Sequence, residues 1–149
     1  MDVFVDVFVD QFFLFFSFFV LLFFMSRARF FCFTANNYTP QQEQHIQSID
    51  CKWLVYGHEH TKEGEGTPHL QGAIYMKTVK SFKQMNELFT FEGRGVHIEA
   101  CKGSFKENFE YCTKEDKDGY FEKGERPMDK KEQGEREQKK WKRARELAE

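Results

Sequence analysis

Residues 52–77, KWLVYGHEHTKEGEGTPHLQGAIYMK, decide the fold expected for this chain. Residues 52–58 form a short run rich in apolar and aromatic side chains, and residues 69–77 form a second one. The segment at 63–68 contains two glycines and ends in proline, which is typical of a loop. Two strands joined by such a loop predict a β-hairpin, in which the end of the first strand returns to face the start of the second.

The segments upstream of this hairpin add a strand and a helix. Residues 29–35 are rich in aromatic side chains and precede the turn pair Asn36-Asn37, so we expect a buried strand there. The Thr-Pro pair at 39–40 is typical of an N-cap followed by a first helical position, and it predicts a helix over 40–49.

Downstream of the hairpin, the apolar pattern alternates between the periods of helices and strands. A capping-box pair, Ser104 and Glu107, marks the start of the last helix of this region. The expected elements are a helix over 79–89, a strand over 94–101, a helix over 104–115 and a strand over 119–123. The whole order predicts an α+β fold with a central antiparallel five-stranded sheet and flanking helices.

The two ends of the chain differ in composition from its middle. Residues 1–25 contain an apolar run, 12–25, that is interrupted only by a serine. As a helix this run is about 21 Å long, shorter than the roughly 30 Å hydrocarbon core, and it has no basic segment typical of a signal peptide. We interpret residues 1–25 as a hydrophobic extension without catalytic function, with a membrane anchor or partner-binding helix as the alternative. The folded domain is expected over 26–126, and a charged, partly helical tail or linker over 127–149.

Charge and cysteine content leave the function open. The formal net charge is −2, but the first 25 residues contain three acidic and no basic residues, and without them 22 basic residues face 21 acidic ones. A nearly neutral domain can still bind nucleic acid through a local patch. The four cysteines show no C-x-x-C spacing, so neither a zinc site nor a disulfide framework is indicated, and free thiols in a reducing compartment are expected.

Three side chains of the hairpin have the chemistry of a cation site. His69 and Gln71 are two positions apart in a strand, so they project from one face. Hairpin pairing brings Glu59 toward His69, and a carboxylate, an imidazole and an amide suit Mn²⁺ or Mg²⁺ better than a closed zinc site. His58 and His60 are either competing ligands or surface residues near the site. The alternative for His69 and Gln71 is an ordinary polar strand face.

A tyrosine and a lysine share one face of the helix predicted at 104–115. Tyr111 and Lys114 are three residues apart, which places them at neighbouring positions on the helix surface. A phenol, whose pKa is ordinarily about 10, is a poor nucleophile at neutral pH, but a metal that polarises a phosphate and a lysine that stabilises developing charge make attack feasible. The alternative is a packed tyrosine beside a solvated lysine.

Three short motifs carry a family resemblance. FTANN at 33–37, PHLQG at 68–72 and YCTK at 111–114 occur in the order and approximate spacing of the three motifs of rolling-circle replication initiators, the Rep proteins of small circular single-stranded DNA viruses. Residues 29–126 resemble the HUH endonuclease domain of these proteins, closest in style to those of circoviruses and nanoviruses. The resemblance implies an RRM-like topology and an enzyme that nicks and joins single-stranded DNA.

The resemblance also implies roles for individual residues. Tyr111 is then the nucleophile, which forms a covalent 5′-phosphotyrosine link, and Lys114 positions or neutralises the scissile phosphate. Glu59, His69 and Gln71 are the ligands of Mn²⁺ or Mg²⁺. The residues expected to contact DNA are Thr34, Asn36 and Asn37. Two departures from the wider pattern are Ala35 in place of leucine and Gln71 in place of a second histidine.

The partners implied by the resemblance are a single-stranded origin stem-loop, the host replication machinery and, when a helicase domain is attached, further copies of the chain. The host nucleus is the expected location, and a membrane partner is not expected. No G-x-x-x-x-G-K-[ST] sequence occurs in this chain, so ATP-driven unwinding is not assigned to it. The alternative function is a non-enzymatic, RRM-like module that binds single-stranded nucleic acid, and a plasmid or an integrated viral remnant is an alternative source.

Overall fold

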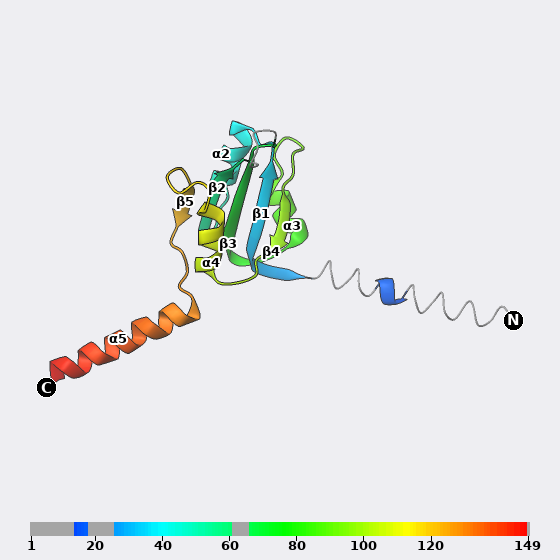
Figure 1. Ribbon diagram of the computed structural model, residues 1–149. Coiled ribbons are helices and arrows are strands. Elements are labelled where there is room, and N and C mark those ends of the chain that lie inside the picture. Colours follow the sequence, from blue (N-terminus) through cyan, green and yellow to red (C-terminus); the bar gives the residue numbers. More distant parts are fainter. Residues whose placement is uncertain (1–13, 18–25, 61–65, 149) are drawn as a thin grey trace.

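The computed structural model describes residues 14–17, 26–60 and 66–148, and its centre is a five-stranded sheet in the order β4-β1-β3-β2-β5 (Figure 1). All four strand pairings are antiparallel. The elements are β1 (Arg27–Asn36), α2 (Pro40–Ser48), β2 (Trp53–Glu59), β3 (His69–Ser81), α3 (Phe82–Phe89), β4 (His97–Ala100), α4 (Phe105–Thr113), β5 (Phe121–Gly124) and α5 (Lys130–Ala148). The predicted α+β class, with an antiparallel five-stranded sheet and flanking helices, is confirmed.

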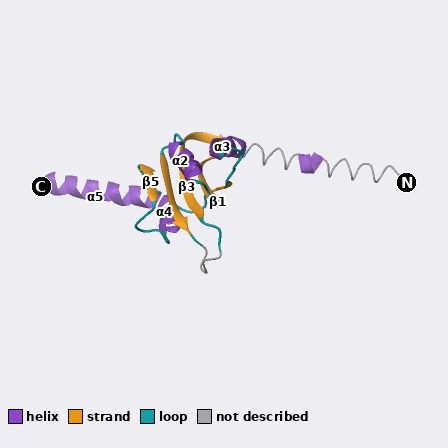
Figure 2. Cartoon of the chain, turned by 90° about the horizontal axis from the view of Figure 1, so that it is seen from above, coloured by secondary structure: helices purple, strands orange, loops and turns teal. Residues whose placement is uncertain are grey.

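The helices lie on both faces of the sheet. Helices α2 and α3 cover one face, and α4 lies on the other (Figure 2). The α2/α3 face holds the larger hydrophobic cluster, which includes Phe31, Phe33, Leu54, Ile74 and Phe89. Because successive side chains of a strand point to opposite faces, the strand residues that alternate with Phe31, Phe33, Leu54 and Ile74 point toward α4.

The α4 face has a smaller apolar cluster and a polar end. Trp53, Val55, Ala73 and Cys112 are its buried members. Phe105 on the first turn of α4 packs against this cluster, with its ring centroid 6.2 Å from that of Trp53. Further along the same face, the strand positions change from apolar to polar.

Several predicted boundaries differ from the structure, and two elements begin three residues later than expected. The helix expected from residue 79 begins at Phe82, because Ser81 is its N-cap in a capping box with Gln84 and the strand before it extends through Ser81. The strand expected over 94–101 is limited to β4, because Phe91 and Arg94 form an isolated bridge that closes a turn.

Most of the N-terminal extension predicted over 1–25 lies outside the described residues, of which 14–17 are helical. Within the described part of the chain, the structure contains no helix with the length and apolar character needed to cross a membrane. At the other end, α5 buries none of its side chains and projects away from the sheet (Figure 1).

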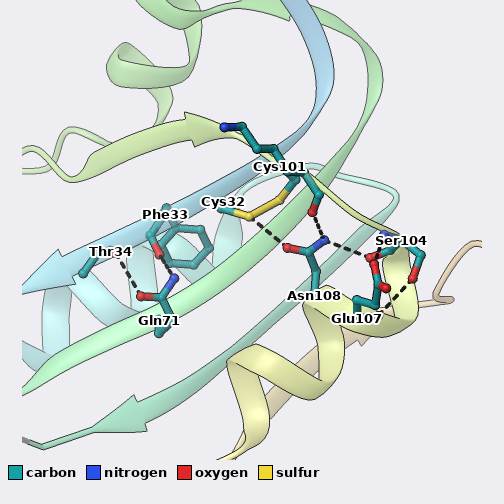
Figure 3. The surroundings of a disulfide bond; sticks show 9 residues. Cys32, Phe33, Thr34, Gln71, Cys101, Ser104, Glu107 and Asn108 are labelled. Carbon is teal, nitrogen blue, oxygen red and sulfur yellow. Dashed lines mark hydrogen bonds between the residues drawn. A yellow bond between two sulfur atoms is a disulfide. The ribbon is translucent and has the colours of Figure 1, made fainter.

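The expectation of four free cysteines was wrong for two of them. Cys32 and Cys101 form a disulfide with a Cα–Cα distance of 5.1 Å and a sequence separation of 69 residues (Figure 3). The C-x-x-C criterion detects only local pairs, whereas the pairing of β1 with β4 brings these distant residues together. Asn108 of α4 has its Oδ1 atom 3.2 Å from the Cys32 sulfur. Cys51 and Cys112 are free, as expected.

Reduction of the Cys32–Cys101 bond should lower the free energy of unfolding. Closing a loop of this length constrains the unfolded chain, and the chain-entropy account puts the effect at about 4 kcal/mol. The measurement is urea unfolding followed by circular dichroism, with and without a thiol reductant. The sensitivity to reductant should disappear in Cys32→Ser and persist in Cys51→Ser. A wild-type midpoint that is unchanged by the reductant would contradict a stabilising disulfide.

Candidate active site

The β2–β3 hairpin places Glu59 directly opposite His69. The two residues are register partners, and His69 Nε2 lies 2.9 Å from Glu59 Oε2. Glu59 is 7% exposed, so its carboxylate is buried at the end of β2. The ten residues that separate them in sequence therefore do not separate them in space, as the hairpin predicted.

Gln71 belongs to the neighbouring β2–β3 residue pair on the same face of the sheet as Glu59 and His69. It pairs with Gly57 on β2 and with Thr34 on β1. The Thr34 hydroxyl donates a hydrogen bond of 3.1 Å to Gln71 Oε1, and Gln71 Nε2 donates one of 3.4 Å to the Phe33 carbonyl (Figure 3). Residues 59, 69 and 71, the predicted ligand positions, thus lie on two adjacent cross-strand pairs of one sheet face.

The donor set of these three residues fits a hard divalent cation. Glu59 Oε1 is buried and has no hydrogen-bond partner among the residues that the structure describes, which is costly for a carboxylate oxygen unless another group binds it. His69 Nδ1 lies 3.3 Å from the Thr67 carbonyl, to which Nδ1–H can donate, and Nε2 faces Glu59 Oε2 at 2.9 Å. A cation held by both residues would replace this Nε2–Glu59 contact. The described residues contain no group of three His, Cys, Asp or Glu side chains able to hold a metal, so an amide oxygen is needed to complete a triad here.

Tyr111 and Lys114 come together at the end of α4, as their spacing predicted. Lys114 Nζ lies 3.9 Å from the centroid of the Tyr111 ring. Tyr111 is 53% exposed, so about half of this residue is accessible to a substrate. Lys114 is the C-cap residue, where a cation is also favoured by the partial negative charge of the helix end.

A glycine allows the end of α4 to approach the sheet. A Cβ atom at Gly57 would overlap the carbonyl oxygen of Cys112, the residue after Tyr111. Gly57 pairs with Gln71, so the last turn of α4 packs on the β2–β3 pair that includes Gln71, a candidate ligand. Burial, together with the negative charge of Glu59, raises the pKa of the Cys112 thiol to about 12.

Acidic side chains from later segments hold both ends of α4. The Asp129 carboxylate accepts hydrogen bonds from the backbone N–H groups of Phe105 and Lys106, at 2.8 and 3.2 Å. After the helix, Asp116 Oδ2 accepts one of 3.0 Å from the backbone N–H of His58. The nucleophile candidate therefore lies on a helix that is tied to the linker before α5 and to β2.

His58 is part of an ion network and not a ligand beside Glu59. Its Nδ1 lies 2.6 Å from Asp116 Oδ2, and its Nε2 lies 2.9 Å from Glu43 Oε1. Burial lowers the pKa of His58, but the hydrogen bonds and charges of Asp116 and Glu43 outweigh burial, and its pKa is raised overall. His58 thus joins α2, β2 and the segment after α4. His60 is exposed.

The three residues expected to contact DNA have different surroundings. Asn36 is exposed and pairs with His69, beside the candidate ligands. Asn37 has a φ of 49°, donates its N–H to the Pro68 carbonyl and accepts a hydrogen bond from Arg94 at its own carbonyl. Thr34 is half-buried and its hydroxyl is engaged by Gln71. Ala35 is fully buried in the larger core, on the other face of β1.

Sequence reasoning missed the residues that position α4. Gly57 had a readable signal, since a glycine inside a strand often marks a close backbone approach. Asp116 and Asp129 had none, because an acidic residue in a charged segment is ordinarily solvated.

Comparison with known proteins matches the part of the chain that holds these features. The family described as "Putative viral replication protein" matches residues 28–115. The chain is 38% identical over 93 residues to the replication-associated protein of Pigeon circovirus, an alignment that covers 59% of this chain and 27% of that protein. It is 40% identical over 94 residues to the master replication protein of Banana bunchy top virus, covering 62% of this chain and 30% of that protein.

A third relative, the replication-associated protein of Human associated cyclovirus 1, is 34% identical over 102 residues, which cover 67% of this chain and 35% of that protein. The chain therefore spans about a third or less of the length of these relatives. The family match covers more than half of the chain and includes all the candidate site residues. This chain belongs to the family of viral replication proteins.

Proposed function

We propose that this chain is the nicking domain of a rolling-circle replication initiator, which cuts and rejoins single-stranded origin DNA. The observation that carries the proposal is the position of Tyr111 and Lys114 at the end of α4. Cys112, the residue after Tyr111, packs its carbonyl against Gly57, and Gly57 is the register partner of Gln71. A nucleophile, a cation and a ligand triad at one end of one sheet face have the composition that phosphodiester transfer requires. The names of the relatives, as replication-associated and master replication proteins, support the same role.

The proposed reaction is a transesterification. The Tyr111 oxygen attacks the phosphorus of a phosphodiester and gives up its proton, and the bond from phosphorus to the 3′ oxygen breaks. That oxygen takes up a proton and becomes a free 3′-hydroxyl, while the 5′-phosphate stays on Tyr111. The reverse reaction with a 3′-hydroxyl reseals the strand, since the phosphotyrosine bond keeps the energy that hydrolysis would lose.

Lys114 and the ligand triad have separate tasks in this proposal. Lys114, close to the Tyr111 ring, offsets the negative charge that develops on the phosphate. Glu59, His69 and Gln71 hold Mn²⁺ or Mg²⁺, which polarises a phosphate oxygen when bound. Glu59 Oε1 supports this assignment, because it is buried without a partner in the described part of the chain and a cation would supply one.

The partners and location follow from the same proposal. The substrate is a single-stranded segment of an origin stem-loop, and Asn36, next to His69 in the sheet, is available to contact it. Action in the host nucleus, with the host replication machinery, remains a prediction. So does assembly with further copies of the chain when a helicase domain is attached.

Replacement of the Tyr111 hydroxyl is the direct test of the proposed chemistry. Purified protein is incubated with Mn²⁺ and 5′- or 3′-labelled stem-loop oligonucleotides of candidate origins, and the products are separated on a denaturing gel. The wild type should produce a cut strand and a protein adduct on the 3′-labelled fragment. Tyr111→Phe should produce neither, because it lacks the attacking oxygen, whereas Tyr120→Phe, another tyrosine on the surface, should retain both.

A wild-type protein that binds these strands and never cuts them, across metals and sequences, would contradict the nicking function. The non-enzymatic binding module would then be the better assignment. Cutting without an adduct would contradict the nucleophilic role of Tyr111.

Gly57→Ala should slow nicking through the position of α4. The added methyl overlaps the Cys112 carbonyl, so the helix end that carries Tyr111 must move. A misplacement of about 1 Å can cost roughly 100-fold in rate, and we expect a loss of that order. The measurement is the single-turnover rate of adduct formation, with circular dichroism and Mn²⁺ affinity as checks that the sheet is intact.

Gly95→Ala is the matched control, because the nearest atom to its added Cβ is the Thr90 hydroxyl at 4.0 Å. Its nicking rate should equal that of the wild type. If Gly57→Ala also nicks at the wild-type rate, the contact with α4 does not position the nucleophile.

A further inference from the structure

The side-chain amide of Gln71 is held at both of its ends by β1. Its Oε1 atom accepts the Thr34 hydroxyl at 3.1 Å, and its Nε2 atom donates to the Phe33 carbonyl at 3.4 Å (Figure 3). Thr34 and Gln71 are register partners on neighbouring strands, so the hydroxyl reaches the amide without distortion of the backbone. Among the three candidate ligands, only Gln71 has an amide, whose oxygen and NH₂ group have similar shapes but opposite hydrogen-bonding roles.

The two contacts determine which end of the amide faces which partner. A backbone carbonyl can only accept, so the NH₂ group of Gln71 must face Phe33 and the oxygen must face Thr34. An amide oxygen has two lone pairs, and the Thr34 hydroxyl occupies one of them. The other remains available to a cation.

We propose that Thr34 is a positioning residue for metal binding, which orients the Gln71 oxygen toward the cation, and that DNA contact is not its main role. This inference rests on the proposed function, in which Gln71 is a metal ligand. Without the Thr34 hydroxyl, only the longer 3.4 Å hydrogen bond to the Phe33 carbonyl holds the amide, so the amide can rotate more easily and present its NH₂ group, which cannot ligate a metal. A carboxylate at this position would not need such a partner, because its two oxygens are equivalent.

The surroundings of Thr34 support a role directed at Gln71. Thr34 is half-buried, whereas Asn36, two residues along the same face, is exposed and free to meet a substrate. The Thr34 hydroxyl has Gln71 Oε1 as a partner. Removal of outer contacts of this kind typically weakens metal binding 10- to 100-fold, and the lower end is expected for a neutral amide.

The test measures Mn²⁺ affinity of the full chain without DNA, from the electron paramagnetic resonance signal of free Mn²⁺. The variants are Thr34→Val, which keeps the shape and the β-branch, Thr34→Ser, which keeps the hydroxyl, and Gln71→Ala, which removes the proposed ligand. We expect Thr34→Val to bind Mn²⁺ about tenfold more weakly. Thr34→Ser should restore most of the affinity, and binding of single-stranded DNA in the presence of a chelator should be unchanged in both.

A second pair of variants separates positioning from a general structural effect. In Gln71→His the ligand is an imidazole, whose orientation does not depend on an amide oxygen. Adding Thr34→Val to Gln71→His should therefore change Mn²⁺ affinity by less than twofold. An equal loss in both backgrounds would overturn the proposal, because Thr34 would then act on the sheet and not through Gln71.

The remaining outcomes separate the metal site itself from the positioning role of Thr34. If Gln71→Ala binds Mn²⁺ as the wild type does, Gln71 is not a ligand, and both the metal site and the role of Thr34 are overturned. If Gln71→Ala loses affinity while Thr34→Val does not, the metal site stands and only the inference about Thr34 fails. Loss of DNA binding by Thr34→Val in the chelator, with Mn²⁺ affinity unchanged, would return Thr34 to DNA contact.

Discussion

The close contact between the end of α4 and β2 is the constraint on which the candidate site depends. It requires a residue without a side chain at Gly57, because a Cβ atom there would overlap the Cys112 carbonyl. Tyr111 precedes Cys112 and Gln71 pairs with Gly57, so one contact between backbones relates the nucleophile candidate to a ligand candidate. Backbone contacts depend less on rotamers than side-chain contacts do, and they fix the helix with little freedom.

The length of α4 agrees with this role. Nine residues of helix span about 13 Å, and the strand from Trp53 to Gly57 spans about the same distance. Phe105 at the start of the helix packs on Trp53, and Cys112 near its end meets Gly57. The Glu59–His69 pair lies one step beyond the helix end. The helix thus covers the apolar part of this face and stops where the polar side chains begin.

Much of this arrangement could be predicted from sequence, because its causes are local. The hairpin predicted the pairing of Glu59 with His69, and helical spacing predicted that Lys114 would meet Tyr111. The disulfide, the two aspartates that hold α4 and the hydroxyl of Thr34 were missed or given another role. Each of these depends on a partner at least 23 residues away in sequence, which periodicity and composition do not reveal. The boundary at Ser81 was missed for a different reason, since strand pairing with β1 continues into a segment whose apolar spacing also fits a helix.

The first motif acquires a structural meaning from these contacts. The first four residues of FTANN lie on β1, the strand between β4 and β3, and Asn37 follows in a turn. The strand residues of the motif alternate between opposite faces of the sheet. Phe33 and Ala35 point into the larger core, where Ala35 is fully buried, so a larger side chain would need a compensating loss of volume around it. Thr34 and Asn36 point to the other face, beside Gln71 and His69 respectively. The motif can therefore stabilise the core through Phe33 and Ala35. Through Thr34 and Asn36 it can also support PHLQG at 68–72, independently of any contact with DNA.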